Sequence, residues 1–198
     1  MKLKRSLAVA VFVLAMSVEV PNVFAQPPKY KQAKVSFDDF KELVEGLEPH
    51  RAQRLIDFDT FLKKAKEPNT IILDSRSAFR FDRVHLKGAK HLAFTDFTQT
   101  NLAQVIPSFD TTILIYCNNN FEGDEVDFAT KMAPSFPPPP KDRIATQMAV
   151  QARPRMMALN IPTYVNLYGY GYRNVYELNE LLSVKDPRVV FEGSLKKQ

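Results

Sequence analysis

Two short apolar runs, at residues 70–73 and 112–116, limit the fold of this chain more than any other feature of its sequence. Neither run alternates apolar with polar residues, as a strand with one face in water does. Strands that are apolar throughout are buried on both faces, and this is typical of a parallel sheet covered by helices. The sequence therefore predicts an α/β fold in which helices flank a parallel sheet.

Helices and strands are predicted to alternate on either side of these two runs. Ser36 is expected to cap a helix that Gly46 and Pro49 close, and Asp57 is expected to cap the helix that follows. The residues predicted to form further strands are 55–56, 91–93 and 161–169, and those predicted to form helices are 58–66, 78–84, 97–106 and 173–182.

Residues 1–25 have the composition of a cleavable export signal. Lys2, Lys4 and Arg5 precede an apolar stretch at residues 7–18, and small residues before the expected cut predict cleavage after Ala25. The stretch is short for a membrane span, so no stable membrane anchor is expected after cleavage; an uncleaved anchor is the alternative. These features predict a periplasmic or secreted protein.

Charge, histidine content and spacing argue against three classes of function. The 27 Lys and Arg residues exceed the 22 Asp and Glu residues only slightly and are spread along the chain, so no nucleic-acid partner is expected. The three histidines lack metal-ligand spacing, and we therefore expect no metal site. Gly123 stands where a cysteine phosphatase needs the arginine that binds phosphate, which argues against that activity.

Cys117 is the only cysteine, and it directly follows the apolar run at residues 112–116. The carboxyl end of a parallel strand faces the crevice in which α/β sheets bind ligands. Asn118, Asn119 and Asn120 are expected to form a tight turn with left-handed backbone angles, whose N–H groups would hold a thiolate or persulfide anion. A lone exported cysteine is otherwise a buried, inert residue or forms a disulfide with a second chain, and both alternatives stay open.

Residues 71–92, which read IILDSRSAFRFDRVHLKGAKHL, resemble the first half of a rhodanese-like domain. Asp74 and Arg76 match the Asp-x-Arg motif of that family, and residues 85–89 match its His-Ile-x-Gly-Ala motif. Cys117 falls where the family carries its sulfur-accepting cysteine.

The resemblance implies a rhodanese-like domain at residues 53–185, with a central parallel sheet of about five strands. Residues 165–182 are similar to the closing strand, glycine turn and helix of the family. A linker and helix at residues 26–52 would precede this domain, and a tail at residues 186–198 would follow it.

The resemblance also implies sulfur transfer without a cofactor. Cys117 would accept sulfur from a small sulfur-containing donor as a persulfide and pass it to a thiol acceptor. The residues that would bind the donor and the persulfide are Asn118, Asn119, Asn120, Phe121 and Glu122, with Asp74 and Arg76 in supporting roles.

Two departures from the family pattern leave a second function open. The loop after Cys117 carries no arginine or lysine, which active thiosulfate sulfurtransferases commonly use to attract the anionic donor, and acidic residues follow at positions 122–127. A proline-rich insert is expected at about residues 124–142. The alternative function is therefore a non-catalytic binding module for a small ligand or a protein partner.

Overall fold

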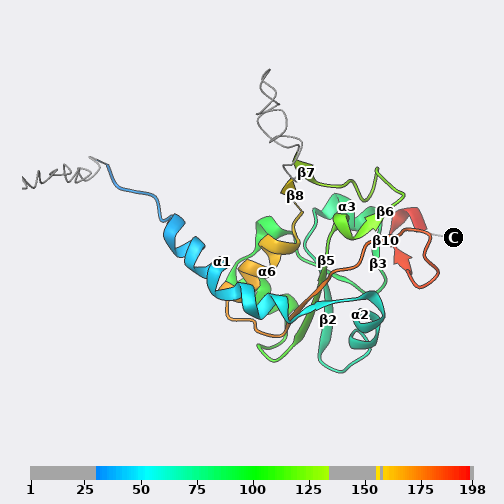
Figure 1. Cartoon of the computed structure of the whole chain (residues 1–198), viewed down its shortest axis with the longest axis horizontal. Helices are drawn as coiled ribbons and strands as arrows, with labels where there is room; N and C mark the ends of the chain where they lie inside the picture. The colour runs from blue at the N-terminus through cyan, green and yellow to red at the C-terminus, as the bar shows by residue number, and fades with distance from the viewer. Residues whose placement is uncertain (1–29, 134–154, 157, 197–198) are drawn as a thin grey trace, which may run out of the picture. The chain divides into compact units, whose positions relative to one another are not determined.

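The computed structural model describes residues 30–133, 155–156 and 158–196 (Figure 1). The described residues from Ser36 onward belong to one compact unit, and the short described segment at residues 30–35 forms no helix or strand. The predicted export signal and residues 134–142 of the predicted insert lie outside the described residues. Among the described helices, none is long and apolar enough to cross a membrane.

A five-stranded parallel sheet forms the centre of the unit. Its order is β1 (Leu55–Ile56), β9 (Val175–Leu178), β5 (Thr112–Tyr116), β2 (Thr70–Asp74) and β4 (Lys90–His91). All four neighbouring pairs are parallel, so the carboxyl ends of the strands lie along one edge. The predicted α/β fold with about five parallel strands is confirmed, and β5 is its central strand.

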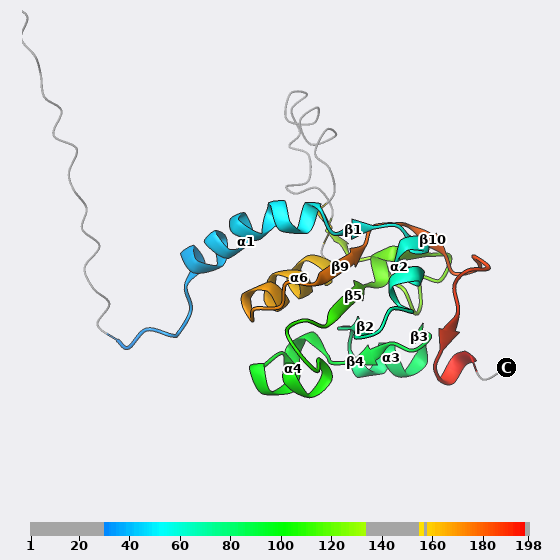
Figure 2. The same ribbon diagram turned by 90° about the horizontal axis from the view of Figure 1, so that it is seen from below.

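The two apolar runs are buried on both faces, as their lack of alternation predicts. Ile113 and Ile115 of β5 pack in a cluster with residues of α1 (Phe37–Ala52), α4 (Gln99–Val105) and α6 (Asn160–Gly169). Leu114 and Tyr116 pack in a second cluster with residues of α2 (Phe58–Lys64). Figure 2 shows α1, α6 and α4 on one side of the strands and α2 on the other.

The predicted N-caps are present, but α1 is longer than predicted. The Ser36 hydroxyl accepts the N–H of Asp39 at 3.1 Å, and Asp57 accepts that of Thr60 at 2.7 Å. The prediction that Gly46 and Pro49 close the first helix is wrong, because α1 continues through Pro49 to Ala52. Side-chain bonds from Arg51 to Glu177 and between His50 Nδ1 and the Tyr164 hydroxyl hold this last part of the helix, despite the hydrogen bond that proline cannot donate.

Two elements near the C-terminus are exchanged relative to the prediction. Residues 161–169, predicted as a strand, lie in helix α6, and residues 173–182, predicted as a helix, contain strand β9. Pro162 lies in the first turn of α6, where the missing N–H has no partner in a helix anyway. Short apolar segments do not distinguish helix from strand by periodicity, and here tertiary packing decides.

Residues 186–196, which belong to the predicted tail, are part of the folded unit. Strand β11 (Phe191–Glu192) pairs antiparallel with β3 (His85–Leu86), and the 3-10 turn η3 (Ser194–Lys196) follows it. The other short elements are α3 (Ala78–Arg83), η1 (Phe94–Asp96), the parallel pair β6 (Phe121–Glu122) and β10 (Leu182–Ser183), and the antiparallel pair β7 (Met132–Ala133) and β8 (Arg155–Met156).

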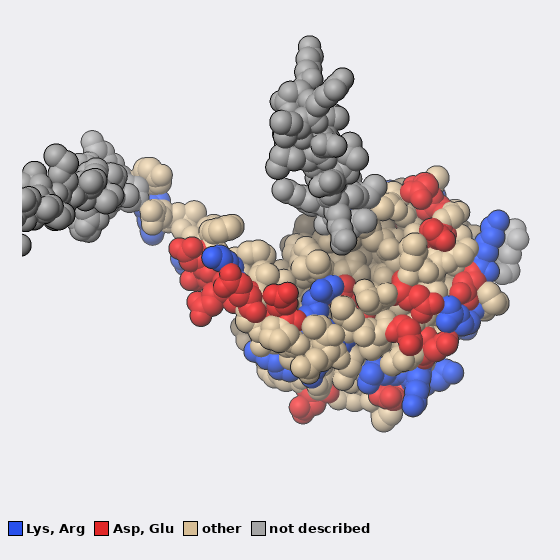
Figure 3. Space-filling view, in the orientation of Figure 1, with Lys and Arg blue, Asp and Glu red and all other residues tan. Residues whose placement is uncertain are grey.

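Acidic side chains are gathered along the exposed side of α1, as Figure 3 shows. Aspartates in the first turn suit the positive end of the helix dipole. At the other end of the helix, Arg51 forms an ion pair with Glu177 of β9, with Nε and Oε2 2.6 Å apart. This pair joins α1 to the sheet beside the carboxyl ends of its strands.

Candidate functional site

Cys117 lies at the carboxyl end of β5, directly before the 3-10 turn η2 (Asn118–Asn120). Its side chain has no exposed surface. Because β5 is the central strand, the thiol lies at the middle of the edge at which parallel sheets bind ligands. We call residues 117–120 the cysteine loop.

The thiol of Cys117 is held in a neutral state by burial. Its Sγ accepts the backbone N–H of Leu159 at 3.4 Å. Burial raises the pKa of the thiol, and the N–H groups of Leu159 and Asn118 and the charges of Lys131 and Arg76 only partly oppose this effect. The nucleophilic form of a cysteine is the thiolate. Burial therefore disfavours the nucleophilic form of Cys117 in this conformation.

Asp74 and Arg76 form a buried ion pair at the end of β2. Arg76 Nη2 lies 2.7 Å from Asp74 Oδ2, Nε lies 3.0 Å from Oδ1, and the backbone N–H of Arg76 bonds the same carboxylate at 2.9 Å. The two residues are 2 % and 0 % exposed. Burial alone would lower the pKa of Arg76, but the hydrogen bonds and charge of Asp74 outweigh it and raise this pKa.

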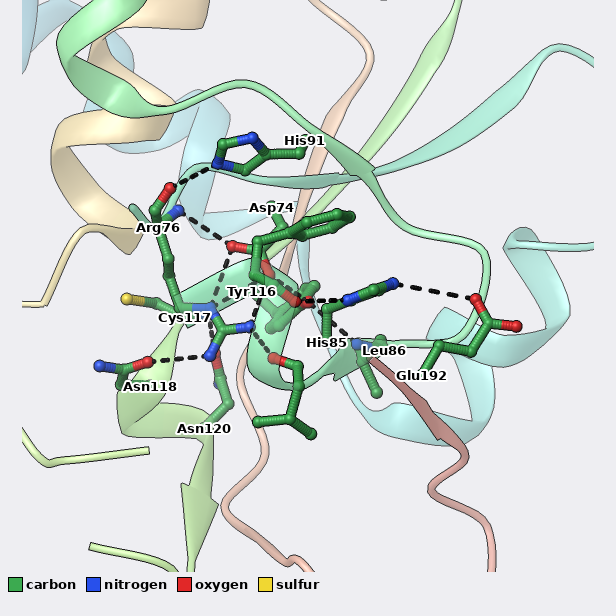
Figure 4. Close-up of polar contacts among 12 residues, drawn as sticks. Asp74, Arg76, His85, Leu86, His91, Tyr116, Cys117, Asn118, Asn120 and Glu192 are labelled. Carbon is green, nitrogen blue, oxygen red and sulfur yellow. Dashed lines mark hydrogen bonds and ion pairs between the residues drawn. The ribbon is translucent and has the colours of Figure 1, made fainter. Parts of the chain in front are cut away.

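The same arginine reaches the cysteine loop. Its Nη1 donates to Oδ1 of Asn118 at 3.2 Å, and its Nη2 donates to the carbonyl oxygen of Val84 at 2.6 Å. Figure 4 shows the guanidinium between the Asp74 carboxylate and Asn118. Asp74 and Arg76, predicted to support the site, are thus joined to the residue that follows the cysteine.

Tyr116, which precedes the cysteine, completes this network. Its hydroxyl donates to Asp74 Oδ2 at 2.5 Å and accepts the N–H of Leu86 at 3.0 Å. Burial raises the pKa of this tyrosine well above its usual value, and the negative charge of Asp74 adds a smaller effect in the same direction. The hydroxyl therefore stays protonated and can donate to the carboxylate.

Asn120 holds the cysteine loop from the other side. Its Oδ1 accepts the backbone N–H of Cys117 at 2.9 Å and Nδ2 of Asn160 at 3.0 Å. Its Nδ2 donates to the carbonyl oxygens of Leu178 at 2.8 Å and of Glu180 at 3.3 Å. The amide thus joins the end of β5 to the chain after β9.

The asparagines do not adopt the predicted left-handed backbone. Among the described residues other than glycine, only Asn69 has a positive φ, whereas residues 118–120 form a right-handed 3-10 turn. The prediction is wrong because the amides of the three asparagines bind distant parts of the chain. Asn119, for example, exchanges hydrogen bonds of 3.2 and 3.0 Å with the backbone of Lys131.

Phe121 and Glu122, also predicted as site residues, leave the loop as strand β6. The Phe121 ring is buried, and its centroid lies 4.7 Å from that of Phe128 and 5.3 Å from that of Phe191. Phe121 therefore lies in the core, and the exposed Glu122 lies at the rim of a cavity on the β9 side of the cysteine loop.

A cavity of about 320 Å³ lies on the β2 side of the cysteine loop, and its lining includes Asn118 and Leu159. Three basic residues line it, Arg76, Arg80 and Lys131, and no carboxylate is among its described lining residues. Hydroxyl groups of Ser75, Ser77, Thr95 and Thr130 add hydrogen-bonding capacity. We call it the cationic cavity, because its lining favours an anion.

The sequence did not reveal Lys131 as a site residue. The segment after Asp127 folds back, and the hydrogen bonds between Asn119 and the Lys131 backbone hold it against the cysteine loop. Lys131 is exposed and has no ion pair with a described residue. Arg80 is partly engaged, since it donates to the Val126 carbonyl oxygen and lies 3.9 Å from Asp127. Only the three-dimensional fold brings these basic residues to the cysteine loop.

A second cavity, of about 430 Å³, lies on the β9 side of the loop. Its lining includes Asn119, Asn120 and Asn160 together with the carboxylates of Glu122, Glu125 and Glu177. Arg51 is the one basic residue among the described residues that line it, and it is paired with Glu177. We call it the acidic cavity. The cysteine loop thus separates two cavities of opposite charge.

No group of three His, Cys, Asp or Glu side chains within the described part of the chain is arranged to hold a metal ion. His85 and His91 are used structurally: His85 Nδ1 lies 2.7 Å from the Phe81 carbonyl oxygen, and His91 Nε2 lies 2.8 Å from that of Arg76. The cysteine loop and the cavities on either side of it form the candidate site.

Residues 57–137 match the family model of the rhodanese-like domain. No curated protein sequence matches the chain. The BH2092 protein of Bacillus halodurans has a similar crystal structure, with 15 % identity, a TM-score of 0.37 and coverage of 80 % of this chain and 86 % of its own. A rhodanese with anions from E. coli has 15 % identity, a TM-score of 0.33 and coverage of 63 % and 98 %. The family match shows that residues 57–137 of this chain are similar to the rhodanese-like domain.

Proposed function

We propose that this rhodanese-like domain transfers sulfur through a persulfide on Cys117. The observation that carries the proposal is the position of the thiol, at the carboxyl end of the central strand. Its chain neighbour Asn118 lines a cavity that Arg80 and Lys131 also line. A cationic cavity next to a nucleophile suits an anionic sulfane-sulfur donor such as thiosulfate.

The reaction needs no cofactor. The thiolate of Cys117 attacks the outer sulfur of thiosulfate and forms a new S–S bond. The bond between the two sulfur atoms of the donor breaks, and sulfite leaves with its electron pair. The product is a persulfide anion on Cys117, which then passes its outer sulfur to a thiol acceptor.

Charges and N–H groups near Cys117 support both anionic states of the sulfur. The N–H of Leu159 and the charges of Lys131 and Arg76 each act to lower the pKa of the thiol, although burial prevails. A persulfide anion in the same place would be stabilised by the positive charges of Lys131 and Arg76. Because the thiol has no exposed surface, the proposal requires the backbone at Leu159 to move away from Sγ when the donor enters.

The second candidate function is a non-catalytic binding module. It is favoured by the full burial of Cys117 and by its raised pKa, which are typical of an inert cysteine. In this case the cavities bind a small ligand or a protein partner, and the Cys117→Ser variant keeps the cellular role.

The deciding experiment is intact mass spectrometry of the purified protein after incubation with thiosulfate, mercaptopyruvate or polysulfide. We expect one added sulfur atom on the wild type and none on Cys117→Ser. Lys131→Gln should load more slowly from thiosulfate, whereas Lys87→Gln, which removes an exposed charge outside the cationic cavity, should load as fast as the wild type. If no donor adds sulfur and the thiol is alkylated slowly, sulfur transfer is overturned and the non-catalytic binding module is the function that the result supports.

We also propose that the chain is exported and cut after Ala25. The support is the sequence alone: basic residues, an apolar stretch at residues 7–18 and small residues before the cut. Expression of the full chain in a bacterium and the mass of the protein recovered from the periplasm test this proposal. A mass that includes residues 1–25 would contradict it.

A further inference from the structure

We propose that the acidic cavity binds the sulfur acceptor, and that this acceptor carries an amine group on an apolar body. The inference rests on the proposed sulfur transfer and adds a second substrate site to it. Donor and acceptor would then reach Cys117 from opposite sides of the cysteine loop.

The charge of the cavity comes from carboxylates that the protein does not neutralise. Glu122 and Glu125 are exposed at its rim, and neither forms an ion pair with another described residue. Glu177 is different, because both of its carboxylate oxygens accept hydrogen bonds from Arg51, at 2.6 and 2.7 Å. The lining therefore carries an excess of negative charge that attracts a cation.

A buried oxygen without a partner points independently to a ligand. Asn160 lines the cavity and is 9 % exposed, and its Oδ1 has no hydrogen-bond partner among the described residues. The Nδ2 of Asn160 donates to Oδ1 of Asn120 at 3.0 Å. The Nδ2 of Asn120 in turn donates to the Leu178 carbonyl oxygen at 2.8 Å. These bonds fix the orientation of both amides. A buried acceptor left unpaired is costly, and an ammonium or amine N–H would satisfy it.

The walls of the cavity suit an apolar body on the same ligand. Ile161 and Leu181 line it and are 48 % and 61 % exposed, which is high for large apolar side chains. The volume of about 430 Å³ is in the range of small-molecule sites. An alkyl chain that ends in an ammonium group would cover these side chains and place its charge near the carboxylates.

The cavity is joined to the reacting residue through one side chain. Asn120 lines the cavity, and its Oδ1 bonds both the Cys117 N–H and Asn160. In the second half of the reaction, the thiolate of the acceptor attacks the outer sulfur of the persulfide. A bond forms between these two sulfur atoms, the bond between the outer sulfur and Sγ breaks, and Cys117 regains its thiolate. Opposite charges in the two cavities would keep donor and acceptor from competing for one place.

Binding of n-butylammonium to the full chain tests the cavity without any sulfur chemistry. In an NMR titration of the wild type, we expect the side-chain amide of Asn160 to shift with n-butylammonium and not with butyrate. The double variant Glu122→Gln/Glu125→Gln should bind about tenfold more weakly, from the loss of two solvent-exposed ion pairs. The matched double variant Glu42→Gln/Glu48→Gln, on exposed residues of α1, should bind as the wild type does. The proposed cation site would be overturned if butyrate shifted the Asn160 amide as much as n-butylammonium does. It would also be overturned if the two double variants bound n-butylammonium with equal affinity.

The acceptor role is tested separately on the persulfide-loaded protein. The rate of sulfur release to cysteamine is divided by that to 2-mercaptoethanol, so that the reactivity of the protein's persulfide cancels. We expect this ratio to fall about tenfold in Glu122→Gln/Glu125→Gln and to stay unchanged in the α1 control. An unchanged ratio in both variants would overturn the acceptor role. If no donor loads Cys117, the proposed sulfur transfer is overturned, and the acceptor role is overturned with it. The binding of n-butylammonium would still decide whether the acidic cavity is a cation site.

Discussion

A hydrogen bond of 3.2 Å from Arg76 Nη1 to Asn118 Oδ1 connects the end of β2 to the cysteine loop. The same guanidinium is held by Asp74, whose carboxylate also accepts the hydroxyl of Tyr116 at 2.5 Å. Residues on both sides of Cys117 therefore depend on one buried ion pair. The position of the thiol is set from the neighbouring strand as well as from its own.

Replacing Arg76 with methionine should destabilise the protein by about 3–5 kcal/mol, because it leaves the charge of Asp74 buried without a partner. Arg76→Lys should also destabilise it, since a lysine cannot form the two parallel bonds to the carboxylate. Urea denaturation measures both changes. Lys87→Met, at an exposed position, is the control, and a loss below about 1 kcal/mol for Arg76→Met would contradict the structural role of the pair.

Asn119 and Asn120 are neighbours with different roles, and alanine substitutions should separate them. Asn120→Ala removes four hydrogen bonds and leaves the N–H of Cys117 without its acceptor, so we expect a loss of about 1–3 kcal/mol. Asn119→Ala should cost less, because its bonds to the Lys131 backbone are exposed and water can replace them. Denaturation curves with equal midpoints for the two variants would contradict this assignment.

The pH dependence of Cys117 alkylation should show the effect of burial. Because burial raises the pKa of the thiol, the rate with iodoacetamide should keep rising above about pH 8.5, where an ordinary thiol is half ionised. Lys131→Gln removes a positive charge that lowers this pKa, so the rate at a fixed alkaline pH should fall. High salt should reduce the difference between the two proteins, since Lys131 is exposed. A rate that levels off below pH 8.5 would show that the thiolate is stabilised in solution.

Patterns among neighbouring residues in the sequence predict some helices and strands of this fold correctly and others wrongly. The strands β2 and β5 and the caps at Ser36 and Asp57 depend on residues next to one another, and the structure confirms them. Helix α6 and strand β9 were exchanged, because both are short apolar segments and packing on either side of the sheet decides between helix and strand.

Some residues of the candidate site could also be predicted from short motifs, and others could not. Asp74, Arg76 and Cys117 belong to short motifs, and the structure joins Asp74 and Arg76 to the cysteine loop. Lys131 could not be predicted, because its approach to the loop depends on side-chain bonds from Asn119 to a distant backbone. The acidic cavity could not be predicted either, since it combines α6, the cysteine loop and the end of β9.

The C-terminal segment that pairs with β3 comes very close to the backbone at the end of α3. Gly193 follows β11 with a φ of +127°, and a Cβ atom there would overlap the carbonyl oxygen of Arg83 and lie 2.7 Å from its carbonyl carbon. Gly193→Ala should therefore destabilise the protein by about 1–3 kcal/mol through strain and steric overlap. Gly88→Ala is a matched control, because Gly88 also has a positive φ, of +78°, but a Cβ there would meet no atom within 4 Å. We expect the control to lose less stability, and thermal denaturation of the two variants measures the difference. Equal stability would mean that the close approach between Gly193 and Arg83, and with it the packing of the C-terminal segment against the end of α3, does not persist in solution.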